Sequence, residues 1–317
     1  MLQGVTNLTH VCTRHICHKT CGNAFICEDF RVLYSVKTMN RVKKMIKLIL
    51  SDMDGTLLNS DGHVDEVKLK AMQRLMAQAG VHFAAVTGKQ AERVEALFGD
   101  LVEDVWILGD SATRIKRNGN FVYESLLPKE VGRNIIMAIE TLAPNVTIIA
   151  CTKEAAVIRG DRPEQDKHMV KGSYQVVKEV ADLQTIDEDC VKITIYDQTK
   201  QAFNLKPKLD QFLDQAYIVA SEPAWIDIAN VGVHKGTTVQ ELQRLLGVTK
   251  LETAAFGDGL NDIELMAESH YSFAMSNAVD EVKQAARYTT GSNDEAAVFT
   301  TVADLLHLQI GSVENEN

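Results

Sequence analysis

The chain lacks any apolar stretch long enough to cross a bilayer as a helix, so we do not expect a membrane protein. Its first thirty residues also lack the continuous apolar segment of a secretory signal. Because these residues are basic and poor in acid, an organelle transit peptide stays open as an alternative. The sequence contains no internal repeat and no low-complexity tract.

Cysteine is scarce in the body of the chain, where only Cys151 and Cys190 occur. This scarcity predicts a reduced domain without a disulfide framework, with the cytoplasm as its default location. Basic residues are also fewer than acidic ones: the chain has 33 Lys and Arg residues and 43 Asp and Glu residues, which gives a formal net charge of −10. Such a field repels nucleic acid and anionic membranes on average, so neither is an expected partner. A small anionic substrate remains possible, since a local cation or metal ion can override the global field.

Residues 1–44 differ in composition from the rest, with a charge balance of +5 against −15 and four of the six cysteines. They show no strand or helix periodicity over residues 1–40, and Met45 stands directly before the first expected core strand. We therefore expect a dispensable extension that is disordered or results from an upstream start. A targeting segment or a metal-binding arm is the alternative, although the possible zinc ligands follow no paired spacing. These ligands are His10, Cys12, His15, Cys17, His18, Cys21 and Cys27.

From Ile46 onward, apolar runs alternate with segments of helical periodicity. Runs at 46–50, 81–86, 105–108 and 253–256 each end in polar or Gly-bearing loops, which is typical of strands in a parallel sheet covered on both faces. The pattern changes between residues 128 and 231, where strands are expected to follow one another. We predict an α/β fold with a doubly wound, Rossmann-like core formed by residues 45–127 and 232–311. Residues 128–231 would form an inserted α+β cap, and residues 312–317 a short tail.

Asp52 and Asp54 are the strongest chemical signal, because they follow the first expected strand at a spacing of two. That spacing directs both carboxylates to the same side of the chain. Open α/β sheets bind ligands beyond the carboxyl ends of their strands, where these residues lie. One carboxylate could attack phosphorus while the other delivers a proton to the leaving oxygen. Taken alone, the same residues could also form an ordinary turn after a strand.

Further polar groups follow other elements of the same pattern. Thr87-Gly88 ends the second strand and offers a hydroxyl and an unobstructed N–H to a phosphate oxygen. Lys235-Gly236 opens a helix, where an ammonium and free N–H groups favour an anion. The segment 257–262, Gly-Asp-Gly-Leu-Asn-Asp, supplies two more carboxylates, and oxygen ligands of this kind suit Mg²⁺.

Together, the four motifs 52–56, 87–88, 235–236 and 257–262 resemble those of the haloacid dehalogenase superfamily. The long insert before Lys235 and the segment 275–278, Met-Ser-Asn-Ala, are similar to the Cof-type phosphatases of that superfamily. The resemblance covers about residues 45–308. It implies a cap inserted after the third core strand and a phosphatase that uses Mg²⁺.

The resemblance also implies roles for single residues. Asp52 would be the nucleophile, and Asp54 the general acid that later activates the hydrolytic water. The phosphoryl group would be bound by Thr87, Gly88, Lys235 and Asn261. The metal would be bound by Asp52, Asp54, Asp258 and Asp262.

Three positions depart from the pattern of the family. Lys89 stands where Arg usually follows the Thr-Gly pair, and a point cation does not reproduce a bidentate guanidinium. Gly109-Asp110-Ser111 replaces Asn-Gly-Ala, and Ala296 stands where Gly is usual. We expect Lys89 and Asp110 to influence substrate selection, with Asp110 at the mouth of the site.

The sequence thus predicts a cytoplasmic, Mg²⁺-dependent phosphomonoesterase that hydrolyses a sugar phosphate or a similar small phosphometabolite through an aspartyl phosphate. A phosphomutase on the same scaffold is the alternative enzyme, and a non-catalytic phosphometabolite sensor is the alternative from another class. The cap residues carry no transferable motif that names the substrate.

Overall fold

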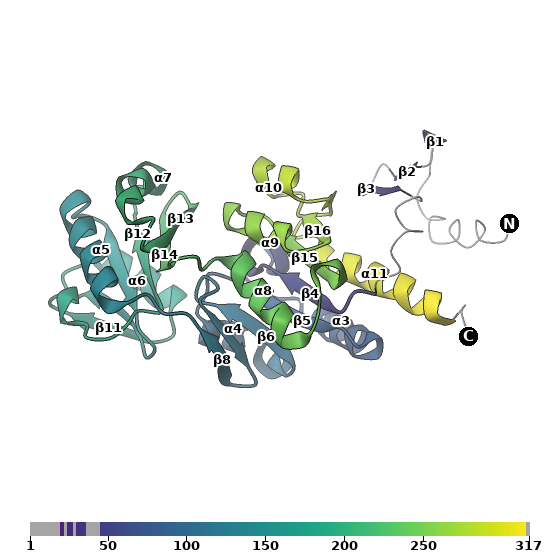
Figure 1. Ribbon diagram of the computed structural model, residues 1–317, viewed down its shortest axis with the longest axis horizontal. Helices are drawn as coiled ribbons and strands as arrows, with labels where there is room; N and C mark the ends of the chain where they lie inside the picture. Colours follow the sequence, from purple (N-terminus) through teal and green to yellow (C-terminus); the bar gives the residue numbers. More distant parts are fainter. Residues whose placement is uncertain (1–19, 22–23, 28–29, 36–44, 315–317) are drawn as a thin grey trace.

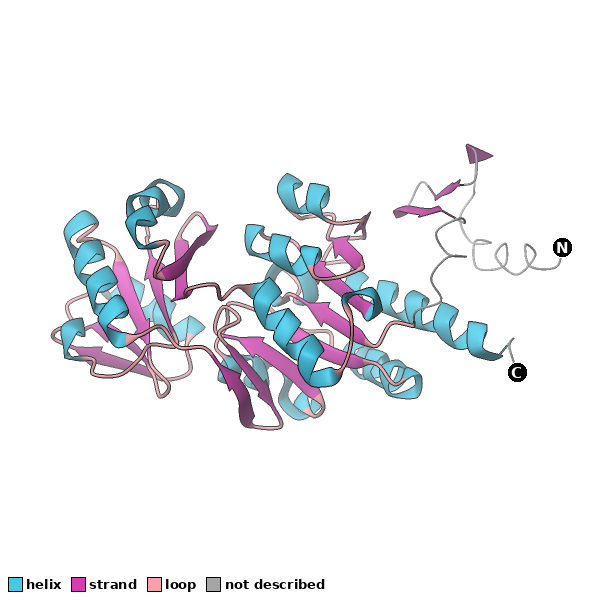
Figure 2. Ribbon diagram, viewed as in Figure 1, coloured by secondary structure: helices cyan, strands magenta, loops and turns pink. Residues whose placement is uncertain are grey.

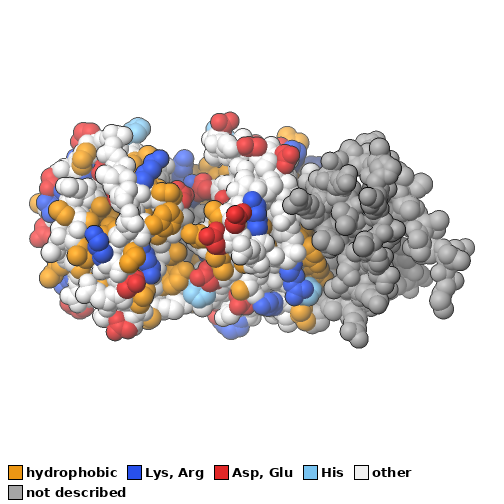
Figure 3. Space-filling view, turned by 90° about the horizontal axis from the view of Figure 1, so that it is seen from above, with side chains coloured by type: hydrophobic (Ala, Val, Ile, Leu, Met, Phe, Trp, Pro, Cys, Tyr) orange, Lys and Arg blue, Asp and Glu red, His pale blue; other side chains and the backbone are white. Residues whose placement is uncertain are grey.

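The computed structural model describes residues 20–21, 24–27, 30–35 and 45–314. Two bodies follow one another along the long axis, the core and the smaller cap (Figure 1). Charged side chains of both signs are scattered over the face of each body shown in the space-filling view (Figure 3). None of the helices in the described part of the chain is long and apolar enough to cross a membrane.

The core contains an eight-stranded sheet in which six parallel strands continue into an antiparallel hairpin (Figure 2). In spatial order the strands are β17 (Tyr288–Thr289), β16 (Tyr271–Ala274), β15 (Thr253–Gly257), β4 (Leu48–Ser51), β5 (His82–Val86), β6 (Val105–Gly109), β7 (Arg114–Arg117) and β8 (Asn120–Glu124). The strands β4, β5, β6 and β15 form where the apolar runs predict them. Strands β7 and β8 were not predicted, because neither contains a long continuous apolar run: β7 reads Arg-Ile-Lys-Arg and β8 reads Asn-Phe-Val-Tyr-Glu.

Strand order places the ligand crevice between β4 and β15. From β4 the chain builds outward through β5 and β6, whereas from β15 it builds the opposite way through β16 and β17. Right-handed crossovers then put the connecting helices on opposite faces, which makes the core doubly wound as predicted. The core helices are α3 (Glu66–Ala79), α4 (Ala91–Phe98), α8 (Lys235–Leu246), α9 (Ile263–Ala267), α10 (Asp280–Ala285) and α11 (Ala297–Glu314).

Apolar burial explains where these helices lie. Leu69, Met72 and Met76 recur at helical spacing on α3, and all three are buried in one cluster with the sheet. The helix is capped by the Asp65 side chain and ends at Gly80, which adopts the left-handed conformation. Since α11 packs against α3 and continues to Glu314, the expected tail at 312–317 begins too early.

The cap is a six-stranded sheet with helices, as the prediction of an inserted α+β module requires. Its spatial order is β11 (Val177–Val180), β10 (Ala156–Arg159), β9 (Thr147–Cys151), β12 (Lys192–Tyr196), β14 (Trp225–Asn230) and β13 (Ala216–Glu222). All neighbours pair antiparallel except β10 and β11. The helices are α5 (Lys129–Leu142), α6 (Glu164–Ser173) and α7 (Ala202–Leu205), and α7 is followed by a 3₁₀ segment at Lys206–Phe212.

Two connections join the cap to the core. The chain leaves after β8 and enters α5, and it returns between β14 and α8. The expected boundaries at 127/128 and 231/232 fall within these two connections.

The extension before Met45 contains three short strands, which the absence of strand periodicity in its sequence did not predict. They are β1 (Thr20–Cys21), β2 (Ala24–Cys27) and β3 (Phe30–Ser35), paired antiparallel in a small sheet. Strand β3 lies beside β17 of the core. The possible zinc ligands of the extension lie outside the described residues or have side chains that the structure does not describe.

Candidate active site

The turn after β4 positions Asp52 and Asp54 differently. The backbone N–H of Asp52 donates to the Phe256 carbonyl at 3.0 Å, which ties the end of β4 to β15. The Asp52 side chain is nearly buried, whereas that of Asp54 is 54% exposed. Gly55 takes a φ of 70° and turns the chain back toward the sheet. The arrangement suits a fixed nucleophile beside a carboxyl group that is open to an incoming ligand.

The loop after β15 brings a second pair of carboxylates to the same edge. Asp258 accepts a hydrogen bond of 2.7 Å from the Thr56 hydroxyl on the opposite loop. Asp262 Oδ2 accepts from the backbone N–H groups of Asp258 and Gly259 at 2.9 and 3.0 Å. Asp262 is completely buried and therefore holds the shape of the loop that presents Asp258.

Lys235 joins the two loops from the first turn of α8. Its ammonium lies 2.6 Å from Asp52 Oδ1 and 2.5 Å from Asp262 Oδ1, and its side chain is 3% exposed. With both ammonium contacts inside the protein, the lysine is positioned rather than solvated. One ammonium against the carboxylates of Asp52, Asp258 and Asp262 leaves the site with a deficit of positive charge.

Burial and mutual repulsion shift the pKa values in this cluster. Burial raises the pKa of Asp52 well above its ordinary value, Lys235 offsets part of that effect, and Asp262 and Asp258 add to it. The pKa of Asp258 rises to about 6, mainly through burial, although the Thr56 hydrogen bond opposes the rise. Burial would lower the pKa of Lys235, but Asp262 and Asp52 raise it above its ordinary value. An added cation would favour the ionised form of both Asp52 and Asp258.

The donor set fits a divalent cation. Carboxylate oxygens of Asp52, Asp258 and Asp262 lie within 4.8 Å of one another, and oxygen ligands are those that Mg²⁺ prefers. Both oxygens of Asp262 already accept hydrogen bonds from Lys235 and the loop backbone. Asp52 and Asp258 are therefore the better placed direct ligands, with Asp262 supporting them.

The loop after β5 offers donors on the other side of Asp52. The buried Thr87 hydroxyl accepts from the Lys89 N–H at 3.1 Å, and Gly88 lies between these two residues. The Lys89 ammonium is 3.0 Å from Asp54 Oδ2. Lys89 thus contacts the predicted acid–base residue, which gives it a place in the site. Asn261, the remaining predicted phosphate ligand, is half-buried on the loop after β15.

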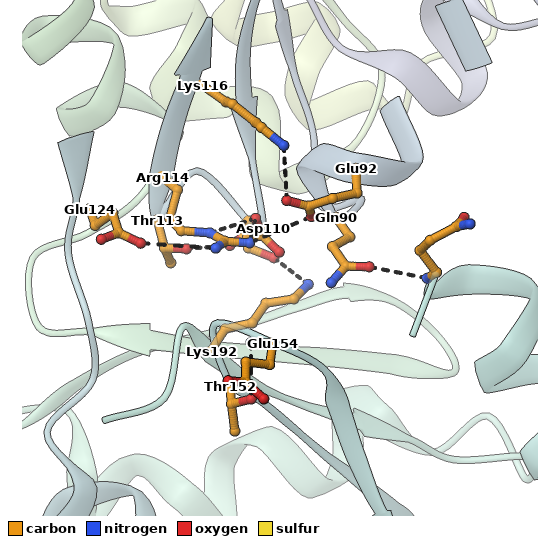
Figure 4. Close-up of polar contacts among 12 residues, drawn as sticks. Gln90, Glu92, Asp110, Thr113, Arg114, Lys116, Glu124, Thr152, Glu154 and Lys192 are labelled. Carbon is orange, nitrogen blue, oxygen red and sulfur yellow. Dashed lines mark hydrogen bonds and ion pairs between the residues drawn. The ribbon is translucent and has the colours of Figure 1, made fainter. Parts of the chain in front are cut away.

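Asp110 is buried and does not face the mouth of the site, so its predicted position there is wrong, whereas its influence on substrate selection stays a prediction. Its carboxylate is 1% exposed and accepts from Arg114 Nε and Nη2 at 3.0 and 2.8 Å (Figure 4). Burial raises the pKa of Asp110, while the Arg114 guanidinium acts in the opposite direction. Only the backbone of Asp110 reaches the site, through an N–H that donates to the Lys89 carbonyl at 2.7 Å.

The loop that holds Asp110 is strained. Asp110, Ser111 and Ala112 all adopt positive φ, at 57°, 60° and 63°, in a region that disfavours side chains with a Cβ. Such clusters persist only when surrounding contacts impose them, and they gather at functional sites. One such contact joins the Ser111 N–H to the Thr87 carbonyl at 3.2 Å.

Several supporting residues were missed or left without a role by sequence reasoning. Asn277, part of the segment that resembles Cof-type phosphatases, donates to the Gly55 carbonyl at 2.8 Å. From the cap, Lys192 donates to the Gly88 carbonyl at 2.9 Å. A lysine in an otherwise apolar strand was the available signal for Lys192, because a buried ammonium needs partners.

Comparison with known proteins agrees with this geometry. The family model for haloacid dehalogenase-like hydrolases matches residues 49–302. The 5-amino-6-(5-phospho-D-ribitylamino)uracil phosphatase YbjI of Escherichia coli is 27% identical over 266 residues, which cover 82% of this chain and 96% of that protein. The 5-amino-6-(5-phospho-D-ribitylamino)uracil phosphatase YcsE of Bacillus subtilis is 27% identical over 260 residues, covering 81% and 94%.

A solved structure has the same fold over nearly its whole length. SMU.1108c from Streptococcus mutans UA159 gives a TM-score of 0.79 at 27% identity, covering 83% of this chain and 99% of that one. The resemblance to the haloacid dehalogenase superfamily, inferred from the four motifs, and to its Cof-type phosphatases, inferred from the insert and the segment 275–278, is confirmed. The chain therefore belongs to the haloacid dehalogenase-like hydrolases, and within that family it is a phosphatase.

Proposed function

We propose that this phosphatase is a Mg²⁺-dependent phosphomonoesterase that hydrolyses a small phosphorylated polyol or sugar through a phosphoryl group carried on Asp52. The observation that carries the proposal is the contact between the Lys235 ammonium and Asp52 Oδ1 at 2.6 Å. It holds one carboxylate oxygen in place, and Oδ2 has no hydrogen-bond partner among the described residues. The exposed Asp54 lies two residues further on, within reach of a leaving group.

In the first step Asp52 Oδ2 attacks phosphorus. A bond forms between Oδ2 and phosphorus as the bond from phosphorus to the ester oxygen breaks, and Asp54 gives that oxygen its proton. Thr87, Gly88 and Asn261 would donate to the phosphoryl oxygens, and Lys235 would offset their charge.

In the second step Asp54 accepts a proton from water as the water oxygen attacks phosphorus. The bond from phosphorus to Asp52 breaks, which releases phosphate and restores both carboxyl groups. Mg²⁺ held by Asp52, Asp258 and the backbone carbonyl of Asp54 would neutralise charge on the phosphoryl group. Asp262 would hold the Asp258 loop through the two N–H groups that it binds.

The substrate class rests on the relatives. YbjI and YcsE are named for a substrate that carries a ribityl phosphate, a linear polyol with its phosphate at the end. We therefore place phosphorylated polyols and sugars first among candidates for this chain.

A phosphate-release screen tests the proposal. The full chain would be assayed with Mg²⁺ against ribitol 5-phosphate, sugar phosphates, nucleotides and p-nitrophenyl phosphate, and again after addition of a chelator. We expect turnover of polyol or sugar phosphates that the chelator abolishes. Full activity of metal-stripped protein in chelator would contradict the metal role, and turnover of nucleotides alone would contradict the substrate class.

A further inference from the structure

The cap presents a short polar row toward the core. Side chains alternate along β12 and β14, so Ile193 and Ile228 face the apolar cluster of the cap, whereas Lys192, Thr194 and Asp227 face the other way. All three polar residues are buried, Asp227 to 8% exposure. Buried charges on a strand need partners, and here the partners come from both domains.

Lys192 connects the cap to the phosphate-binding loop of the core. Its ammonium donates to the Gly88 carbonyl at 2.9 Å, to the Ser111 hydroxyl at 2.9 Å and to Asp227 Oδ1 at 3.1 Å. All three ammonium hydrogens are therefore used, and Lys192 has none left for a ligand. Figure 4 shows the lysine reaching from the cap toward the loop that contains Asp110.

Asp227 is held by one oxygen only. Oδ1 accepts from Lys192 and also from the Thr194 hydroxyl at 2.9 Å, and Thr194 in turn accepts from the Tyr174 hydroxyl at 3.2 Å. Among the residues that the structure describes, Oδ2 has no hydrogen-bond partner. The carboxylate thus has a fixed orientation and one unused acceptor.

The unused oxygen points at the phosphate-binding loop. A Cβ built on Gly88 would lie 3.7 Å from Asp227 Oδ2, so this oxygen borders the residue that follows Thr87. Glu222, on the neighbouring strand β13, also faces this region. Burial raises the pKa of Glu222, and the carboxylates of Asp54 and Asp227 raise it further. The cap therefore contributes the carboxylates of Asp227 and Glu222 to the site, whereas the core loop at Thr87 and Gly88 offers hydrogen-bond donors.

We propose that Asp227 is a specificity-determining residue whose Oδ2 accepts a hydrogen bond from a substrate hydroxyl close to the phosphate ester. A phosphoryl group bound at Thr87 and Gly88 brings its ester carbon and the next carbon beside that oxygen. An ionised carboxylate accepts and cannot donate, so it selects a hydroxyl and repels a second phosphate. The inference rests on the proposed function, because it names the substrate feature that the same site reads.

A purely structural role for Asp227 makes a different prediction. If the carboxylate only balances the charge of Lys192, its loss would destabilise the cap and lower turnover of every substrate alike. If it binds a hydroxyl, its loss would penalise substrates that carry the hydroxyl and spare those that lack it. Two substrates of equal chain length separate these roles: glycerol 1-phosphate has hydroxyls on both carbons beyond the ester carbon, including the one next to it, and propyl phosphate has none.

The test compares Asp227→Asn with the full wild-type chain. Each protein is assayed for kcat/KM and, by calorimetry, for the Kd of both ligands in the presence of Mg²⁺. A hydrogen bond to a charged group suggests that the preference for glycerol 1-phosphate should fall by about 10- to 100-fold in Asp227→Asn. Asp166→Asn is the matched control, because Asp166 is also a buried carboxylate of the cap and accepts from the Thr147 hydroxyl at 2.6 Å. Thr147 begins β9, at the opposite end of that strand from Cys151, which pairs with Lys192. That control should leave the preference unchanged.

Each outcome of this comparison either supports or overturns the proposed role of Asp227. An unchanged preference in Asp227→Asn overturns the inference, as does an equal loss for both ligands. If Asp227→Asn fails to fold, the double variant Lys192→Met, Asp227→Asn removes both buried charges and must show the same loss of preference. If the wild type binds the pair but hydrolyses neither ligand nor p-nitrophenyl phosphate, the proposed function fails, while the ratio of the two Kd values still tests Asp227.

Discussion

Gly55→Ala places a methyl group against the carboxylate proposed to bind the metal. The new Cβ would lie 2.9 Å from Asp258 Cγ and closer still to Oδ2. Gly55 also has a φ of 70°, so the substitution carries backbone strain wherever the side chain points. The strain costs about 1–2 kcal/mol, and reduced freedom of the unfolded chain offsets about 0.4–1 kcal/mol of it. A net loss of about 1 kcal/mol lowers Tm by roughly 2–4 °C.

The clash adds a functional effect that strain alone does not. Asp258 must move by roughly 1 Å to clear the methyl group, and a displacement of that size at a reacting centre can cost about 100-fold in rate. We expect kcat/KM to fall by about that factor, and Mg²⁺ to bind about 10- to 100-fold more weakly. The assays are steady-state phosphate release across Mg²⁺ concentrations and calorimetric titration with Mg²⁺.

Gly62→Ala provides the matched control. Gly62 has a φ of 77° but no atom within 4 Å of a Cβ built on it. It should lose a similar amount of stability and keep its activity and Mg²⁺ affinity. If both variants retained full activity, or if both lost it equally, the placement of Asp258 in the metal site would be refuted.

Three further predictions follow from other parts of the structure. Asp110→Asn should destabilise the protein by about 3 kcal/mol, seen by chemical denaturation, because it weakens a buried ion pair with Arg114; an unchanged stability with altered substrate preference would restore the role expected from sequence. The pKa of Asp258 in the metal-free protein is about 6, so protons compete with Mg²⁺ below that pH. The Kd for Mg²⁺ should therefore rise about tenfold for each unit by which the pH falls below that value, and a Kd that stays constant from about pH 7.5 to 4.5 would contradict this. Residues 45–317 expressed alone should keep the kcat of the full chain, whereas a large loss of kcat or Tm would make the extension structural.

Local patterns were sufficient to predict four of the parallel strands, β4, β5, β6 and β15, and the polar residues that follow them. Asp52, Thr87 and Asp258 each follow a buried apolar run, and parallel strands bring their carboxyl ends to one edge of the sheet. Lys235 could be placed because it opens a helix whose N-terminus faces that edge. The assignment of nucleophile and acid came from the family resemblance, because spacing alone did not distinguish the two carboxylates.

Side-chain orientation in the hairpin could not be predicted from the same patterns. Asp110 follows an apolar strand just as Asp52 does, yet it turns away because Arg114, on the antiparallel strand β7, provides a buried partner. Strand β7 reads Arg-Ile-Lys-Arg, which does not resemble a buried strand until Glu92 and Glu95 are known to neutralise Lys116. Whether a charged side chain is buried, and which way it points, therefore depends on partners that are distant in sequence.

The contact of Lys192 in the cap could not be predicted for the same reason, because its partner Gly88 lies 104 positions away in the sequence. Ala296 departs from the family pattern at a single position: the family usually has Gly there, and Ala296 adopts the positive φ of 55° that glycine tolerates best. The cytoplasmic location and the dispensable extension remain predictions.

The nucleophilic role of Asp52 can be tested most directly by trapping the phosphoryl group on it. In the Asp54→Asn variant, p-nitrophenyl phosphate should still react, because its leaving group needs no proton, but water should attack the resulting intermediate slowly. Rapid mixing should give a burst of about one nitrophenolate per active site. Peptide mass spectrometry after acid quench should then find the phosphoryl group on Asp52, and none when Asp52 is also changed to Asn. Steady turnover by the wild type with no burst in the variant and no label on Asp52, or with the label on another residue, would contradict the account.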